Sequence, residues 1–148
     1  ISNKSPDTPT NRILTSLLCR ERLAFLLQHG LTYVKVSQGS VQKHIMRYPQ
    51  LFATLAIEKH LANGGKKGVI WHTQGSGKTA LAYYNTRYLT HYYAKQGIVP
   101  KFYFIVDRLD LLKQAHQEFT NRNLIVHTIN SRADIARRRH KGRTRPMG

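Results

Sequence analysis

Residues 69–79 of the chain read Val-Ile-Trp-His-Thr-Gln-Gly-Ser-Gly-Lys-Thr. A short apolar run leads into a glycine-rich loop and then an Ala-, Leu- and Tyr-rich stretch, which predicts a strand, a loop and a helix. Gly75 and Gly77 can take backbone conformations that a β-carbon disfavours, so successive N–H groups can face phosphate oxygens. Lys78 can then reach the β- and γ-phosphates, and Thr79 can offer its hydroxyl to Mg²⁺. The loop is predicted to bind a nucleotide triphosphate.

One position departs from the full phosphate-loop pattern. That pattern has a glycine where this chain has His72, at the end of the expected strand. A histidine is tolerable there only if its side chain points away from the triphosphate. The alternative interpretation is a glycine turn between a strand and a helix that binds nothing.

The segments around the loop predict an α/β fold. Helices are expected at 11–29, 50–62, 78–95 and 109–119, strands at 31–36, 69–72, 102–106 and 124–128, and a linker around residues 39–40. Ser131 and Asp134 would cap one more helix. Strand, loop, helix, strand, helix, strand is typical of a three-layer sheet with parallel strands and right-handed crossovers. We therefore expect an incomplete P-loop NTPase (RecA-like) parallel sheet with a helical N-terminal lead-in.

The tyrosines of the expected helix at 78–95 are spaced for packing. They are Tyr83, Tyr84, Tyr88, Tyr92 and Tyr93. We interpret them as half-buried packing residues, and a platform for stacking bases is the alternative.

The charge of the chain is strongly unbalanced. The 148 residues include 24 Lys and Arg against 7 Asp and Glu, a net charge of +17. This excess favours a polyanionic partner, and nucleic acid is the partner that we expect. A solvated basic face that accompanies a larger assembly is the alternative. Basic residues crowd 137–148, but the rest of the chain is basic as well.

Composition also bounds the class and location of the protein. The chain has 41% hydrophobic residues and no apolar run near the roughly 18 residues that a membrane span needs. The first residues lack the basic and apolar regions of a signal peptide. Cys19 is the single cysteine, which excludes an internal disulfide framework. We expect a globular, cytoplasmic protein without a membrane segment.

Three ordered blocks of sequence resemble the restriction (R) subunit of type I restriction-modification enzymes. They are Arg47-Tyr48-Pro49-Gln50, the loop at 69–79, and residues 105–114, which read Ile-Val-Asp-Arg-Leu-Asp-Leu-Leu-Lys-Gln. The likeness covers residues 11–135, and His72 is similar to what this family carries at that place. Such subunits resemble superfamily 2 helicases. They hydrolyse ATP to move double-stranded DNA past the enzyme and cut it with a separate nuclease domain.

The resemblance implies roles for residues of all three blocks. It assigns Gly75, Ser76, Gly77, Lys78 and Thr79 to the triphosphate of ATP and to Mg²⁺. Of the residues in this chain, it gives a catalytic role to Lys78 alone. Arg47 and Gln50 would approach the adenine, since an amide can both donate to and accept from that base. The alternative for Gln50 is a residue at a helix start that faces water.

The third block resembles the motif beside the nucleic-acid track, so Arg108, Lys113 and Gln114 would contact DNA. Arg108 can equally pair with Asp110 on the surface. The resemblance also implies the modification (methyltransferase) and specificity subunits as partners. It divides the chain into a lead-in and linker from a nuclease-side region at 1–45, a partial first ATPase lobe at 46–136, and a basic tail at 137–148.

Several catalytic parts of such a motor are missing. No two of the seven acids are adjacent, so the chain has no Asp-Glu pair to hold Mg²⁺ and position water. A nuclease carboxylate cluster, a second lobe and its arginine finger are missing too. Phosphoryl transfer depends on such groups. We expect the chain to bind nucleotide and hydrolyse it very poorly, although the parent family is an ATP-dependent type I site-specific deoxyribonuclease.

The basic end of the chain suggests a truncated or frame-shifted fragment, or else a native tail that touches DNA phosphates. Two other functional classes stay open. One is another P-loop NTPase, such as a small nucleotide kinase, which usually has its loop nearer the N-terminus. The other is an inert or regulatory basic module for DNA binding or assembly.

Overall fold

The structure is a computed structural model, and it describes residues 18–36, 39–129 and 134. Its elements are α2 (Arg20–Phe25), the π-helical turn η2 (Leu26–Gly30), β1 (Leu31–Lys35), β2 (Val41–Ile45), α3 (Tyr48–Ala62), α4 (Lys78–Ala94) and α5 (Leu109–Asn121). Among these residues, no helix has the length and apolar character that crossing a bilayer requires.

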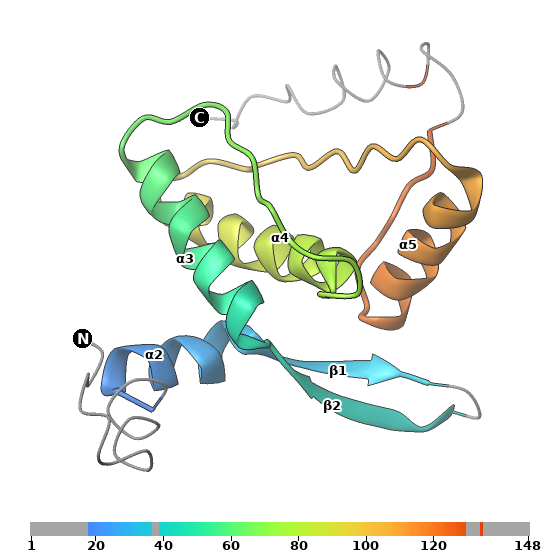
Figure 1. Cartoon of the computed structure of the whole chain (residues 1–148), viewed down its shortest axis with the longest axis horizontal. Helices are drawn as coiled ribbons and strands as arrows, with labels where there is room; N and C mark the ends of the chain where they lie inside the picture. Colours follow the sequence, from blue (N-terminus) through green and yellow to red (C-terminus); the bar gives the residue numbers. More distant parts are fainter. Residues whose placement is uncertain (1–17, 37–38, 130–133, 135–148) are drawn as a thin grey trace, which may run out of the picture.

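Helix α4 is the centre of the described structure. It packs against α3, α5 and η2, and Figure 1 shows α3 and α5 at its two sides with the β1–β2 hairpin below them. Buried side chains from η2, α3, α4 and α5, and from the residue directly after β2, meet in one core, which contains Leu26, Met46, Leu51, Tyr83, Tyr84, Ala115 and Phe119. This core therefore includes residues from both sides of the boundary expected at 45–46.

Local signals set the bounds of α3. Its first turn contains Pro49, which is favourable there because the first N–H groups of a helix need no partner within it. The backbone N–H of Gln50 donates to the carbonyl of Arg47 over 3.0 Å, and the Arg47 N–H donates to Gln50 Oε1 over 2.9 Å. Asn63 ends the helix, and Gly64 follows with a φ of +80°. The helix expected at 50–62 is confirmed.

The other expected helices are also present, with one shortened. Helices α4 and α5 match those expected at 78–95 and 109–119. The helix expected at 11–29 is observed as α2 and η2, and residues 11–17 lie outside the described part. Ser131, whose cap with Asp134 was expected, and the basic tail at 137–148 also lie outside it.

The strand expected at 31–36 is confirmed, but it pairs in an unexpected way. β1 and β2 form an antiparallel hairpin, with Leu31 opposite Ile45 and Lys35 opposite Val41. Residues 39–40, where a linker was expected, lie between these two strands, and the strand that follows them was not predicted. Thr32 and Val34 point to the protein interior, whereas most of β2 is exposed.

The parallel sheet is not present in the described residues. Their one sheet is the two-stranded β1–β2 hairpin. Three parallel strands were expected at residues 69–72, 102–106 and 124–128, and these residues have no regular secondary structure. The parallel pairing expected for these segments is not confirmed by the structure, because a ladder needs neighbouring strands that local composition does not reveal.

Candidate functional site

The glycine-rich loop has the bend that the sequence predicts. Gly75 has a φ of +74° and Gly77 a φ of +81°, both in the left-handed region. A β-carbon there costs about 1–2 kcal/mol, which explains the need for glycine at both positions. The Gly77 carbonyl accepts the hydrogen bond of the Leu81 N–H over 2.9 Å, so the second bend leads directly into α4.

The start of α4 has the properties of an anion site. Among the residues that the structure describes, no side chain caps its first turn, so these N–H groups are left for another acceptor. The positive end of the helix dipole lies at the same place. Ser76 precedes the helix, and its hydroxyl oxygen is buried without a hydrogen-bond partner among the described residues. Thr79 is the second residue of α4 and is half-buried. These donors fit the oxygens of a phosphate group.

The ammonium group of Lys78 lies across the bend. It donates to the carbonyl oxygens of His72 over 3.1 Å and of Thr73 over 2.9 Å. Phosphate is a stronger acceptor for a lysine than a neutral carbonyl is. Lys78 is exposed and His72 half-buried, with the ring Nδ1 of His72 buried and without a partner in the described part of the chain. The lysine is therefore held where a phosphate could replace its two carbonyl contacts.

Gln50 joins α3 to the phosphate loop. Its side chain is only 3% exposed, so it does not face water. The amide Nε2 donates to the Gly77 carbonyl over 3.1 Å, and Oε1 accepts from the Arg47 N–H over 2.9 Å. Both ends of the amide are thus engaged by the backbone. The structure therefore brings Gln50 to the loop, and it places Arg47, which is exposed, next to Gln50.

The residues expected at a DNA track lie at the start of α5. The guanidinium of Arg108 pairs with the Asp110 carboxylate through two contacts, Nη2 to Oδ2 at 2.7 Å and Nε to Oδ1 at 3.2 Å. Both side chains are mostly exposed. Lys113 and Gln114 are exposed on the same helix. Arg108 therefore has the surface ion pair that was the alternative to a phosphate contact.

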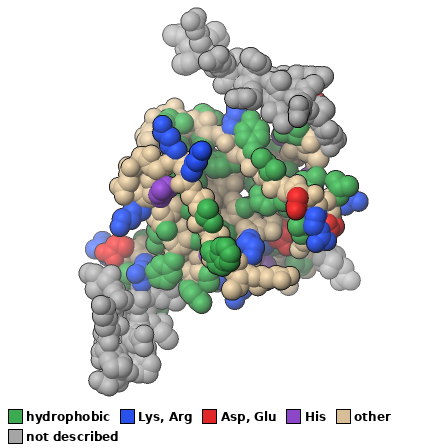
Figure 2. Space-filling model, turned by 45° about the horizontal axis from the view of Figure 1, so that its top comes forward, with side chains coloured by type: hydrophobic (Ala, Val, Ile, Leu, Met, Phe, Trp, Pro, Cys, Tyr) green, Lys and Arg blue, Asp and Glu red, His purple; other side chains and the backbone are tan. Residues whose placement is uncertain are grey.

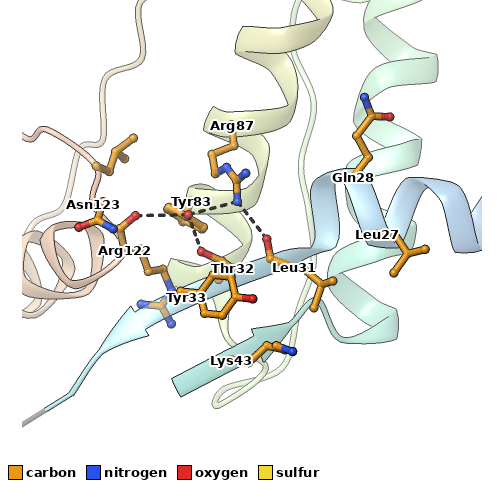
Figure 3. Close-up of a pocket in the computed structure, with 11 residues that line it drawn as sticks. Leu27, Gln28, Leu31, Thr32, Tyr33, Lys43, Tyr83, Arg87, Arg122 and Asn123 are labelled. Carbon is orange, nitrogen blue, oxygen red and sulfur yellow. Dashed lines mark hydrogen bonds between the residues drawn. The ribbon is translucent and has the colours of Figure 1, made fainter. Parts of the chain in front are cut away.

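A polar junction that the sequence does not predict surrounds Tyr83. The Tyr83 hydroxyl lies 2.7 Å from Thr32 Oγ1 on β1, donates to the Arg122 carbonyl over 3.4 Å, and accepts from Arg87 Nη1 over 3.4 Å. Figure 3 shows these contacts converging from β1, α4 and the turn after α5. Tyr83 is 3% exposed, which agrees with its expected packing role. Only the tyrosine itself is a signal in the sequence, because its partners are distant along the chain.

A basic cavity of about 600 Å³ adjoins this junction. It lies between the hairpin, α4 and the turn after α5, and its lining includes Lys43, Arg87 and Arg122 but no acid. Arg122 is itself paired with Glu118 on α5. The net local charge is positive, in keeping with the composition of the chain.

A second cavity, of about 460 Å³, lies between α2, η2, α3 and α4. His29 lines it and has ring contacts with Phe25, Tyr88 and His91. Burial, followed by the nearby His91, lowers the pKa of His29 below its ordinary value. Burial, together with a hydrogen bond to Glu58, raises the pKa of Tyr88. Neither of these two cavities is lined by a residue of the phosphate loop.

Comparison with known proteins gives matches over much of the chain. The family described as "Type III restriction enzyme, res subunit" matches residues 43–143. A protein of Methanocaldococcus jannaschii named as a type I restriction enzyme endonuclease subunit is 39% identical over 83 residues, which are 53% of this chain and 8% of that protein. Type I restriction enzyme endonuclease subunits of Staphylococcus aureus and Staphylococcus saprophyticus are each 36% identical over 74 residues, covering 50% of this chain and 8% of each relative. The matched stretch is thus a small part of each relative's length. No solved structure matches the chain significantly.

Proposed function

Since the chain belongs to the family described as type III restriction enzyme, res subunit, we propose that its loop at 72–79 binds the triphosphate of ATP. The likeness to type I endonuclease subunits that the sequence predicts is confirmed, and it fits a fragment of a restriction subunit with a helicase-like part. The observation that carries the proposal is the pair of left-handed glycines that lead into an uncapped helix, with Lys78 folded over the bend.

Each residue of the loop has a proposed part in holding the nucleotide. Lys78 exchanges its two carbonyl contacts for phosphate oxygens, and the N–H groups after Gly77 donate to the same group. Thr79 offers its hydroxyl to Mg²⁺, which would neutralise phosphate charge when bound. Arg47, whose backbone N–H is bonded to Gln50, would add a positive charge that favours the nucleotide. Gln50 can reach an adenine only by giving up its bonds to Arg47 or Gly77.

In the proposed parent protein, this part belongs to a superfamily 2-type DNA translocase in the cytoplasm. Its sheet is the parallel, RecA-like one, and its partners are double-stranded DNA and the modification and specificity subunits. Translocation and cleavage belong to that whole assembly. For this chain we propose nucleotide binding with very slow hydrolysis, because it carries no adjacent pair of acids.

A titration with a fluorescent ATP analogue and Mg²⁺ tests the proposal. Lys78→Ala should weaken binding by about tenfold or more, because hydrogen bonds to charged groups contribute about 1.5–3 kcal/mol. Lys113→Ala removes an equal charge from an exposed site on α5 and serves as the matched control. Equal affinities of the original chain and Lys78→Ala for the analogue would show that the loop does not bind the triphosphate.

The same chain allows a test of DNA binding. Asp110→Asn frees the Arg108 guanidinium from its ion pair and should strengthen binding to a double-stranded oligonucleotide. Arg108→Ala should weaken this binding. It should also lower the slope of the logarithm of the binding constant against the logarithm of salt concentration by about 1. If the oligonucleotide binds in a salt-sensitive way that neither ATP nor these substitutions change, the chain is a basic binding module instead.

A further inference from the structure

The basic cavity beside the Tyr83 junction combines positive charge with an apolar wall. Its volume of about 600 Å³ lies within the roughly 300–1,000 Å³ of sites that hold small organic ligands. Three cations line it from three different parts of the fold: Lys43 on β2, Arg87 on α4 and Arg122 in the turn after α5. The apolar part of the lining comes from Leu27, Leu31, Tyr33 and Leu124. Such a lining suits a ligand that has an anionic group and an apolar or aromatic body.

Charge alone does not single out this cavity, because basic side chains occur in many parts of the chain. Figure 2 shows Lys and Arg at several separate places on one face of the molecule. The cavity differs because its lining includes no acid and because hydrogen bonds hold its two arginines in position. A side chain that is already held in position loses less freedom when a ligand binds.

Arg87 is held by one end of its guanidinium group. Its Nη1 donates to the Leu31 carbonyl over 3.1 Å and to the Tyr83 hydroxyl over 3.4 Å. Both hydrogen bonds of Arg87 to described residues use that nitrogen, so Nη2 and Nε can donate to a ligand. The residue is exposed, so a ligand can reach it from solvent.

Arg122 has a buried donor that no described residue accepts. Its side chain is 8% exposed, and its Nη1 donates to the carbonyl and to the carboxylate of Glu118. The Nε is buried without a hydrogen-bond partner in the part of the chain that the structure describes. A buried donor without an acceptor is costly, and more so in a charged group. Because Arg122 lines the cavity, an anionic ligand there can supply the acceptor.

The charge and the aromatic ring of the cavity together match a nucleotide with one phosphate. Glu118 neutralises Arg122, which leaves the positive charges of Lys43 and Arg87. A phosphate monoester carries a charge of about −1.5 to −2 at pH 7. Tyr33 is 59% exposed, and the Lys43 ammonium lies 5.9 Å from the centre of its ring. An exposed aromatic ring beside a cation is an arrangement on which nucleobases stack.

We propose that this cavity is a site for a nucleoside monophosphate unit. Lys43, Arg87 and the Nε of Arg122 bind its phosphate, and its base stacks on Tyr33. The unit is either a free nucleoside monophosphate or the 5′-phosphorylated end of a nucleic-acid strand, since both present the same groups. The cavity shares no lining residue with the phosphate loop, so the proposal does not depend on whether that loop binds ATP.

Isothermal titration calorimetry with AMP tests the site in a Lys78→Ala chain, so that the phosphate loop contributes little to binding. We expect AMP to bind this chain, and to lose about tenfold or more in affinity when Lys43→Gln or Arg87→Gln is added. Lys35→Gln is the matched control, because it removes an equal charge from the same hairpin outside the cavity lining. It should leave the affinity for AMP unchanged.

Two further features of the design keep a folding defect apart from a binding defect. Arg87→Gln removes bonds to Leu31 and Tyr83, so Lys43→Gln, at an exposed position, decides the outcome if circular dichroism shows that Arg87→Gln unfolds the chain. Tyr33→Leu should weaken AMP by about fivefold or more, because the base loses its stacking partner. It should leave the affinity for inorganic phosphate unchanged, whereas damage to the fold would lower both affinities.

A single-stranded oligonucleotide with a 5′-phosphate distinguishes the two sources of the ligand. Tighter binding of AMP than of the oligonucleotide assigns the site to free nucleotide, and the reverse order assigns it to a strand end. The proposal is overturned if neither ligand binds, or if Lys43→Gln changes the affinity for neither. It is also overturned if Lys35→Gln weakens binding as much as Lys43→Gln does, since the effect then follows from the overall charge of the chain.

Discussion

The side-chain amide of Gln50 donates to the backbone carbonyl of Gly77, so the first turn of α3 is tied to the last bend before α4. The two residues are 27 positions apart. Because the same amide also accepts from Arg47, a single buried side chain fixes the start of one helix relative to the start of another.

Gln50→Ala should lower the free energy of unfolding by about 1–3 kcal/mol, because it leaves a buried donor and acceptor without partners. Gln50→Glu is the sharper variant. A carboxylate still accepts from Arg47 but repels the Gly77 carbonyl, while a protonated carboxyl can donate to it.

Urea unfolding should therefore show that Gln50→Glu regains stability as the pH falls toward the glutamate range, near about 4.3. Gln114→Glu, at an exposed position of α5, is the control for the added carboxyl. A constant difference between Gln50→Glu and the original chain at all pH values would contradict the proposed role of this hydrogen bond.

Gly77→Ala should destabilise the chain more than Gly75→Ala. Both positions have a positive φ, but a β-carbon on Gly77 would lie 2.6 Å from Gln50 Nε2, whereas one on Gly75 meets nothing within 4 Å. The strained backbone alone costs about 1–2 kcal/mol at each site. Thermal unfolding of the two variants, repeated in a Gln50→Ala background, should show that the difference shrinks once the amide is gone. If the difference persists, the close approach is not its cause.

Tyr83→Phe should cost about 1–3 kcal/mol of unfolding free energy, because it leaves the buried Thr32 hydroxyl without its partner. Thr32→Val alone should destabilise as well. The double variant Tyr83→Phe/Thr32→Val should be less destabilised than the sum of the two, since both polar groups leave together. If the two losses of unfolding free energy add up in a double-mutant cycle measured with denaturant, the two hydroxyls act independently.

His29 should make the chain less stable in mild acid. Its pKa is lowered in the folded state by burial and by the neighbouring His91, Arg87 and Lys95, with Glu58 opposing them. Above the ordinary value of 6.5 both states are neutral, so the effect is absent there. As the pH falls below 6.5, the unfolded chain takes up the proton first, and stability is lost until the pH reaches the folded pKa.

The variant His29→Phe keeps an aromatic ring among Phe25 and Tyr88 but cannot bind a proton. Its stability should fall less steeply than that of the original chain as the pH is lowered below about 6.5. His116→Phe, at an exposed position of α5, is the control. Equal slopes for the original chain and His29→Phe would show that another group causes the acid sensitivity.

The sequence predicts those features that depend on local chemistry. Pro49, Asn63 and Gly64 mark the ends of α3, and Gly75 and Gly77 have the positive φ angles expected of them. These signals work because each acts within a few residues of the chain.

Pairings between distant residues escaped prediction. β2 was missed because its only apolar residues, Val41 and Ile45, are exposed, and its strand form comes from pairing with β1. The segments at 102–106 and 124–128 have strand composition, but a ladder depends on neighbours that composition cannot specify. Within the site, the bond from Gln50 to Gly77 depends on how α3 packs against α4.

The exposed side chain of Trp71 gives the chain an intrinsic fluorescent probe. It is the single tryptophan, it is 91% exposed, and it immediately precedes the loop residues that hold Lys78. Red-edge emission from the isolated chain should therefore come from one place in the molecule, without any attached dye. Whatever removes water from the indole should move that emission toward the blue, so one spectrum follows changes beside the loop.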